Sequence, residues 1–409
     1  MPELNAGDTA WMLVATAMVM VMLPGLALFY GGLVRRKNVL STIMHSFFGL
    51  ALVSVVWVLI GFSLAFGSDI TGLGLIGGPD FLGFSNVGLT PHPVYGTTVP
   101  FVLFAGFQLM FAAITPALIS GAFAERKRFR SFVIFTVLWS LLVYSPIAHW
   151  VWATDGWLFK MGALDFAGGT VVHASSGVAA LVAALAIGRR AKSSDRMEPH
   201  DIPMTVLGAG LLWFGWFGFN AGSALTAGGL AANALVVTNT AAGAATISWV
   251  LASYFHRGKV SVVGAACGAV AGLVAITPAS GFVTAGGAVL IGLAVGGLCY
   301  SATLLRERLR IDDALDVFAV HGVGGTFGAI ATGVFATTAI NAFPGWVDGN
   351  PGQVATQAIA VGAVLLYAGV ATFVIIKVVE FVLGLRVPAD EEEVGLDLAV
   401  HGEVAYQQG

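Results

Sequence analysis

The most regular feature of this chain is a succession of long apolar stretches separated by short segments that carry most of its charges. A membrane-spanning helix needs about 20 mostly apolar residues. Eleven stretches come near or exceed that length, and they cover residues 9–34, 41–67, 99–123, 131–151, 167–188, 203–221, 231–254, 261–277, 282–304, 317–339 and 354–384. Such continuous stretches predict α-helices rather than the alternating segments of about 10 residues that build a membrane β-barrel. The eighth stretch is short and the third contains Pro116.

Composition agrees with this pattern. The chain has 409 residues, of which 57% are hydrophobic and only 10% are charged, whereas a soluble domain usually has about 25% charged residues. We therefore expect an all-α polytopic membrane protein with eleven transmembrane helices. No GxxxxGK[ST] phosphate loop occurs in the chain, which argues against ATP-driven transport by this chain alone.

The distribution of Lys and Arg predicts the orientation. Positively charged residues favour the cytoplasmic side of a membrane. They follow the first, third, fifth, seventh, ninth and eleventh stretches, within residues 35–37, 126–130, 189–196, 257–259, 306–310 and 386. The N-terminus is therefore expected outside and the C-terminus in the cytoplasm. Residues 1–385 form the predicted membrane domain. Residues 386–409 form a cytoplasmic tail, either a solvated, partly disordered end or a regulatory segment.

Two histidines lie inside apolar stretches. His173 is near the start of the fifth stretch and His321 near the start of the tenth. If stretches one to five and six to ten are two blocks, an odd number of crossings inverts the second block relative to the first. Inverted repeats are a common transporter plan, with the substrate site near the midplane. An inverted 5+5 repeat, followed by a final helix, would bring the two histidines toward each other.

Other interpretations apply to each histidine. A lone histidine inside a span is as often structural as functional, because polar residues there face the bundle interior. A catalytic zinc site is poorly supported, since glycines, Gly177 and Gly325, stand four residues after the two histidines where a metal-binding helix would carry a second ligand. We expect no metal and no enzyme. His45 and His149 are expected to reach the membrane interface.

Several ordered motifs resemble those of one family. They are MLPGLALFYGGLVRRKNVLST, SGAFAERKRF, LDFAGGTVVHASSG, GWFGFNAGS, LVAITPASGFV, DALDVFAVHGVGGTFG and the GLD…HGE.AY of the tail. Over nearly its whole length the chain resembles the ammonium transporter (Amt) family of prokaryotic type. The resemblance implies a homotrimer in the inner (plasma) membrane with one narrow conduction path per protomer. It also implies a PII-type signal protein that docks on the cytoplasmic face, no cofactor and no nucleic acid partner.

The resemblance also implies roles for individual residues. The recruitment site for ammonium corresponds to Trp152, Phe107 and Ser223. Below it, a gate of stacked aromatics corresponds to Phe111 and Phe219. The pore corresponds to His173, His321 and Trp216, and Asp165 corresponds to a family aspartate near the path. Without the resemblance, each residue has an ordinary structural interpretation. Phe107 and Phe111 are four residues apart, the usual spacing of core residues on one face of a helix. Trp152 would be a tryptophan at the membrane interface, and Asp165 a helix N-cap with an orienting role.

The chemistry of ammonium fits such a path. Cation–π attraction to an aromatic face stabilises a dehydrated cation by about 0.5–2 kcal/mol. This stabilisation does not offset the several kcal/mol needed to carry a charge through an apolar pore. Deprotonation near neutral pH costs about 3–4 kcal/mol if the pKa is that of an ordinary amine, and potassium has no such route. Two neutral imidazoles can guide ammonia or relay its proton. The sequence leaves both possibilities open, together with an ammonium sensor and a neutral ammonia channel of the related Rh type.

Overall fold

The computed structural model describes residues 3–191 and 198–406, and within them the protein is a bundle of helices with no named strand. The α-helices are α1 (Ala6–Leu33), α2 (Val39–Val56), α3 (Phe62–Phe66), α4 (Phe101–Ile119), α5 (Phe129–Trp139), α6 (Ser145–Trp152), α7 (Trp157–Lys160), α8 (Ser175–Ile187), α9 (Ile202–Gly222), α10 (Gly229–Arg257), α11 (Val262–Ile276), α12 (Ala285–Arg308), α13 (Val323–Phe335), α14 (Gly352–Leu383) and α15 (Ala389–Val394). Short 3₁₀ segments are η1 (Arg36–Asn38), η3 (Leu82–Phe84), η4 (Ser120–Phe123) and η8 (Trp346–Asp348). Short π-helical segments are η2 (Trp57–Gly61), η5 (Ser140–Tyr144), η6 (Gly169–Ala174), η7 (Phe318–Gly322) and η9 (Asp397–His401).

In the part of the chain that is described, ten of these helices or continuous helical runs are long and apolar enough to cross a membrane. The predicted eighth stretch corresponds to α11, which has only 15 residues. At 1.5 Å per residue it is about 22 Å long, shorter than the ~30 Å hydrocarbon core of a bilayer. The third predicted stretch does form a helix, α4, although Pro116 lies within it.

Helix starts follow ordinary capping chemistry. The side chains of Asn5, Asp201, Ser261 and Thr284 each accept a hydrogen bond from a backbone amide three residues later, at the first turns of α1, α9, α11 and α12. These short polar residues stand directly before the apolar runs and satisfy amides that have no partner within the helix. Several sequence-predicted boundaries therefore have a local cause.

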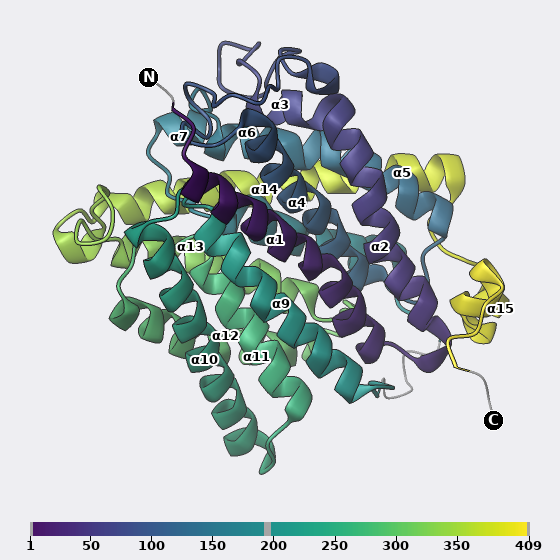
Figure 1. The fold of residues 1–409 in the computed structure, drawn as a ribbon. Helices are drawn as coiled ribbons and strands as arrows, with labels where there is room; N and C mark the ends of the chain where they lie inside the picture. Colours follow the sequence, from purple (N-terminus) through teal and green to yellow (C-terminus); the bar gives the residue numbers. More distant parts are fainter. Residues whose placement is uncertain (1–2, 192–197, 407–409) are drawn as a thin grey trace.

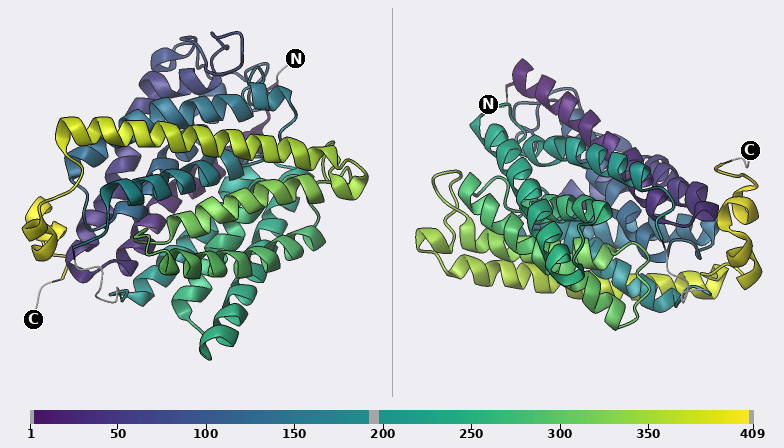
Figure 2. Two further views of the ribbon diagram at one scale, coloured as in Figure 1. Left: turned by 180° about the vertical axis from the view of Figure 1, so that it is seen from behind. Right: turned by 90° about the horizontal axis from the view of Figure 1, so that it is seen from below.

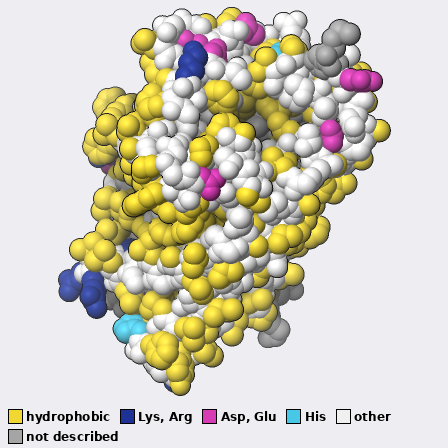
Figure 3. Space-filling model, turned by 90° about the vertical axis from the view of Figure 1, so that its left-hand side faces the viewer, with side chains coloured by type: hydrophobic (Ala, Val, Ile, Leu, Met, Phe, Trp, Pro, Cys, Tyr) yellow, Lys and Arg dark blue, Asp and Glu magenta, His cyan; other side chains and the backbone are white. Residues whose placement is uncertain are grey.

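The two ends of the bundle are distinct (Figure 1). The loop end carries the long segment 67–100 between α3 and α4, and the start of α1 is tied to it by a hydrogen bond from the Asn5 amide to Thr98 O (2.8 Å). The tail end carries α15. Helix α14 runs across one face over α8 and α13 (Figure 2). Hydrophobic side chains cover most of the surface in Figure 3, and charged side chains are few.

The described part of the tail, residues 386–406, is folded against the tail end, which does not support the alternative of a partly disordered end, although several of its residues are exposed. Asp397 is buried and its carboxylate accepts the backbone amides of Leu40 (3.0 Å) and Ser41 (2.8 Å) in the first turn of α2. Glu392 is buried and pairs with Arg386 at 2.6 Å. The acidic character of the tail is thus partly used to cap a helix and to form an ion pair.

Two expectations are wrong. His45 and His149 do not reach a membrane interface, because both side chains are buried. The His45 ring packs 4.4 Å from the ring of Phe132 and 6.0 Å from that of Phe123. His149 lies within α6 and contacts the segment that follows α3. Their positions near the ends of apolar stretches did not reveal that neighbouring elements cover them.

Candidate conduction path

The two histidines inside apolar stretches meet in the interior. His173 lies on η6, which is entered from the loop end, and His321 lies on η7, which is entered from the tail end. Their Nδ1 atoms are 3.2 Å apart, and their rings are 5.3 Å apart at an interplanar angle of 29°. A hydrogen bond between two Nδ1 atoms needs a proton on one of them only. In the neutral pair, one histidine is therefore the Nδ1–H tautomer and the other the Nε2–H tautomer.

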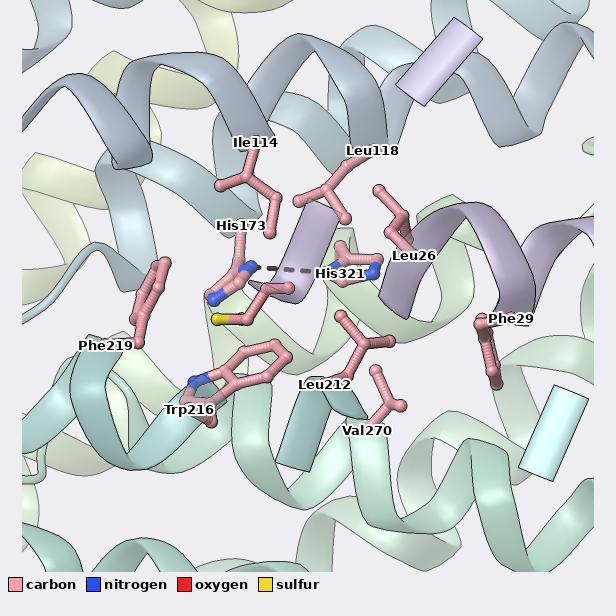
Figure 4. A pocket seen from close by; sticks show the side chains of 11 residues that line it. Leu26, Phe29, Ile114, Leu118, His173, Leu212, Trp216, Phe219, Val270 and His321 are labelled. Carbon is pink, nitrogen blue, oxygen red and sulfur yellow. Dashed lines mark hydrogen bonds between the residues drawn. The ribbon is translucent and has the colours of Figure 1, made fainter. Parts of the chain in front are cut away.

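A narrow cavity surrounds this pair (Figure 4). Its other lining residues are apolar or aromatic: Met22, Leu26, Phe29, Ile114, Leu118, Leu212, Trp216, Phe219 and Val270. The cavity volume is about 10 Å³, at the lower limit for holding one water-sized molecule. A hydrated ion does not fit in such a space. The imidazoles are its main polar groups, and the Nε2 atom of His173 has no hydrogen-bond partner.

Trp216 is held in place beside the histidines. Its indole Nε1 donates to Thr277 Oγ1 at 2.8 Å, and the Thr277 hydroxyl donates to Leu273 O at 2.7 Å. The ring of Trp216 stacks 5.3 Å from that of His173. Because its only donor is already bonded, Trp216 presents an apolar surface to the cavity. Sequence reasoning missed Thr277, since a threonine at the end of an apolar stretch carries no distinctive signal.

Two phenylalanines close the path toward the loop end. The rings of Phe111 on α4 and Phe219 on α9 are 4.1 Å apart and tilted by 30°. Both side chains are buried, and the ring of Phe219 is 6.0 Å from that of His173. The two rings must separate before any molecule can pass between them and reach the histidines.

Trp152, Phe107 and Ser223 lie on the side of the Phe111 and Phe219 rings that faces away from the histidines. Phe111 meets Trp152 edge-on at 5.9 Å and Phe107 at 4.9 Å. Ser223 follows Gly222, which packs closely on the Phe107 ring. The Ser223 hydroxyl donates to Phe219 O at 2.8 Å, so its oxygen keeps lone pairs for an N–H donor.

Asp165 occupies the start of the segment that carries His173. Its carboxylate accepts the amides of Gly168 (2.8 Å), Gly169 (2.6 Å), Thr170 (2.8 Å) and Val171 (3.2 Å) and the Thr170 hydroxyl. Its backbone carbonyl accepts the indole N–H of Trp152 at 2.9 Å. The predicted capping geometry is present, although the residue at the formal cap position is Gly168. Asp165 thus joins the start of η6 to Trp152 on the loop-end side.

The second histidine has a similar arrangement that sequence reasoning missed. Asp313 is buried, and its Oδ2 accepts the amide of Phe318 at 2.7 Å, at the start of η7. Asp165 and Asp313 each stand eight residues before a histidine, so the spacing D-x₇-H occurs twice. Burial, followed by the nearby charge of Asp316, raises the pKa of Asp313 to about 6. The repeated spacing is the signal that could have identified Asp313.

At the tail end a wide cavity of about 620 Å³ lies beside Leu33 and Leu315. Five arginines line it: Arg189, Arg190, Arg257, Arg306 and Arg310. Arg190 pairs with Asp312 and, at 3.1 Å, with Glu125, and Arg306 pairs with Asp316 at 2.6 Å. Within residues 3–191 and 198–406, no group of three or more His, Cys, Asp or Glu side chains could hold a metal ion.

The apolar helical bundle and its narrow interior path define a multi-pass membrane protein of the transporter and channel class. The chain belongs to the ammonium transporter family, because the model of the Ammonium Transporter Family matches residues 10–406. It is 50% identical over 407 residues to an ammonium transporter of Bacillus subtilis, covering 99% of both chains. It is 47% identical over 404 residues to ammonium transporter Amt1 of Archaeoglobus fulgidus, covering 98% of this chain and 100% of the relative.

Solved structures agree with this membership. Mep2 of Saccharomyces cerevisiae superposes with a TM-score of 0.92 at 40% identity, covering 100% of this chain and 93% of the other. A structure described as a sensor Amt protein superposes with a TM-score of 0.89 at 32% identity, covering 96% and 98%. The curated relatives are named as transporters rather than enzymes, and their names support ammonium transport.

Proposed function

We propose that this chain moves ammonium across the membrane by binding the ion, removing its proton and passing ammonia along the two histidines. The observation that carries the proposal is the contact of 3.2 Å between the Nδ1 atoms of His173 and His321 inside an apolar cavity of about 10 Å³. An intact cation would lose its hydration there, at a cost of several kcal/mol. A neutral molecule of the size of ammonia avoids that cost and keeps hydrogen bonds to the imidazoles.

Recruitment is assigned to Trp152, Phe107 and Ser223. Aromatic faces attract a partly dehydrated cation by about 0.5–2 kcal/mol, and the Ser223 oxygen can accept one N–H. The stacked rings of Phe111 and Phe219 then separate this site from the histidines. Ammonium that transfers its proton at the gate, either to water on the loop-end side or to the imidazole pair as a relay, continues as ammonia, whereas potassium has no proton to lose. Selectivity therefore comes from proton transfer rather than from ionic radius.

The proposed topology is eleven crossings, with α11 as the eighth, the loop end outside and the tail end in the cytoplasm. An inverted 5+5 repeat is supported by the repeated D-x₇-H spacing and by the entry of η6 and η7 from opposite ends. The arginines around the cavity at the tail end favour the cytoplasmic side. Residues 1–385 then form the membrane domain and residues 386–409 the cytoplasmic tail, in the inner (plasma) membrane.

Assembly and regulation are proposed from family membership. We assign a homotrimer with one path per protomer, and a PII-type signal protein as the cytoplasmic partner. We assign the tail that caps α2 through Asp397 as the transmitter, because a partner that displaces it would free the first turn of that helix.

A second candidate function is ammonium sensing. It is favoured by the likeness to the structure described as a sensor Amt protein and by the packing of the tail against α2. In that case the path would bind ammonium and report its occupancy through the tail. A neutral ammonia channel is the remaining variant, and it differs in carrying no net charge.

The test is the current evoked by an ammonium pulse on proteoliposomes that contain the purified protein, with a potassium pulse as the control. A saturating current that potassium does not evoke supports charge transfer as ammonium or as ammonia plus a proton. Internal alkalinisation without current indicates a neutral ammonia channel. The absence of both current and alkalinisation would contradict transport and favour the sensor.

A further inference from the structure

His149 is a buried histidine that the proposed path does not use. It lies on α6, three residues before Trp152, and its side chain is fully buried. Its Nδ1 is 3.1 Å from the backbone oxygen of Ala65. A carbonyl oxygen only accepts hydrogen bonds, so Nδ1 carries a proton. In the neutral ring, Nε2 is then a bare acceptor.

That second nitrogen faces two carboxylates. The Nε2 of His149 is 3.6 Å from Asp155 Oδ1 and 3.8 Å from Asp69 Oδ1, and it has no hydrogen-bond partner. A lone pair beside two negatively charged oxygens is unfavourable, whereas a proton on Nε2 would create an imidazolium paired with both aspartates. Although burial raises the pKa of Asp69, hydrogen bonds from the Thr71 hydroxyl and from loop amides lower it well below its usual range. Asp69 is therefore ionised near neutral pH.

Among the described residues, no ion pair competes for the two carboxylates. In the described part of the chain, neither Asp69 nor Asp155 forms an ion pair with Lys or Arg. The other titratable groups bonded to the flanking segments are Tyr95, whose hydroxyl accepts the Thr154 amide at 3.4 Å, and Asp80, which accepts the Ser68 amide at 2.7 Å. Asp69 and Asp155 are thus the charged groups that face the Nε2 atom of His149.

This cluster joins the long segment at the loop end to the helix that carries Trp152. The Asp155 carboxylate also accepts the Asp69 amide at 2.5 Å. Two further bonds run in parallel, from Trp150 Nε1 to Leu75 O (2.8 Å) and from the Trp157 amide to Gly74 O (3.2 Å). Asp155 stands only three residues after Trp152, so loss of its attraction to His149 loosens the turn that ends α6.

We infer that His149 is a positioning residue for the aromatic recruitment site and acts in its imidazolium form, drawing Asp69 and Asp155 together so that Trp152 keeps its orientation. This inference rests on the proposed role of Trp152 in binding ammonium. Deprotonation of His149 weakens the hold on the turn and lowers the affinity for ammonium, while the gate and the two pore histidines are unchanged.

The test measures apparent KM and maximal ammonium current in proteoliposomes at about pH 5.5 and about pH 8. Both sides are kept at the same pH to remove any proton gradient. For the wild type, KM is expected to rise about two- to fivefold at the higher pH. His149→Gln retains a donor for Ala65 O but no charge, so its KM is expected to equal the high value at both pH values with maximal current within about twofold. Asp155→Asn is expected to reduce the pH dependence as well.

His92→Gln is the matched control, because His92 lies in the same long segment and its Nδ1 accepts the amides of Val94 and Tyr95 rather than facing a carboxylate. Wild-type pH dependence of KM in His149→Gln would overturn the inference, as would a loss of maximal current with KM unchanged. Hydrogen exchange of residues 67–78, compared between wild type and His149→Gln at each pH, gives a readout that does not require transport. Faster exchange in the variant at pH 5.5, and equal exchange at pH 8, is expected. A wild type with neither current nor internal alkalinisation would contradict the proposed function, but hydrogen exchange would still test His149.

Discussion

Gly177 and Gly325 hold reciprocal positions around the two buried histidines, His173 and His321. Each stands four residues after one histidine, and each packs against the segment that carries the other. A Cβ on Gly177 would lie 2.1 Å from the Gly322 amide nitrogen, next to His321, and a Cβ on Gly325 would lie 2.8 Å from the Cβ of His173. The helices can approach closely only because both positions lack a side chain, a common device in membrane helix packing.

We therefore expect Gly177→Ala and Gly325→Ala to push η6 and η7 apart and break the contact between the histidines. Overpacking of this kind costs about 1–3 kcal/mol, so both variants should show lower thermal midpoints and reduced ammonium transport. Gly243→Ala, at a helix position with no atom near the added Cβ, is the control and should resemble the wild type. Normal transport in both variants would contradict the steric role of the two glycines.

Replacement of either histidine tests the proton-removal mechanism. His173→Ala or His321→Ala should abolish ammonium transport or allow potassium to pass, because a pore enlarged by the loss of one imidazole can hold water and partly hydrated ions. The measurement compares currents evoked by ammonium and by potassium in the same proteoliposomes. If both variants kept the ammonium selectivity of the wild type, the histidines would have no part in discrimination.

Asp313 predicts a specific dependence of stability on pH. Its pKa is raised to about 6, first by burial and then by Asp316, whereas an unfolded aspartate titrates near 3.9. The folded protein therefore binds more protons than the unfolded chain between about pH 4 and pH 6, and stability falls as pH rises through this window. Asp313→Asn can still accept the Phe318 amide and should remove that fall, a gain of up to about 3 kcal/mol at pH 7.

Thermal midpoints measured from about pH 4 to pH 8 check this prediction. Asp390→Asn is the control, because Asp390 is an exposed carboxylate of the tail. Parallel curves for wild type and Asp313→Asn would show that Asp313 is ionised equally in the folded and unfolded states.

The tail supplies a prediction that is independent of the path. Asp397→Ala leaves the amides of Leu40 and Ser41 without their acceptor, and loss of such a cap costs about 0.5–2 kcal/mol. The tail should then detach more often and be cut faster by a protease added to the cytoplasmic face. Asp390→Asn again serves as the comparison. Equal cleavage rates would mean that the other contacts of the tail, among them the hydrogen bond from the Leu396 amide to Asn38, are enough to keep it docked.

The sequence by itself determined the class of this protein and most of its helices. Long apolar runs with few charges form helices in a bilayer, because a helix satisfies the backbone amides and carbonyls within the segment itself. Capping residues such as Asp201 and Ser261 marked helix starts locally. The motifs around His173 and His321 indicated the family, which the comparisons confirmed. Burial by distant segments has no local signal, and for this reason His45 and His149 were misplaced.

The sequence predicted that His173 and His321 approach each other, but only the tertiary structure decided the geometry of this contact and the other long-range contacts. The 3.2 Å contact between His173 and His321 joins residues 148 positions apart, and it depends on two glycines that look unremarkable in a Gly-rich sequence. The docking of Asp397 on α2 and the pairing of His149 with Asp69 and Asp155 are likewise long-range. Hydropathy reports how a segment partitions between water and lipid, but the position of a polar atom inside the bundle is set by how whole helices pack.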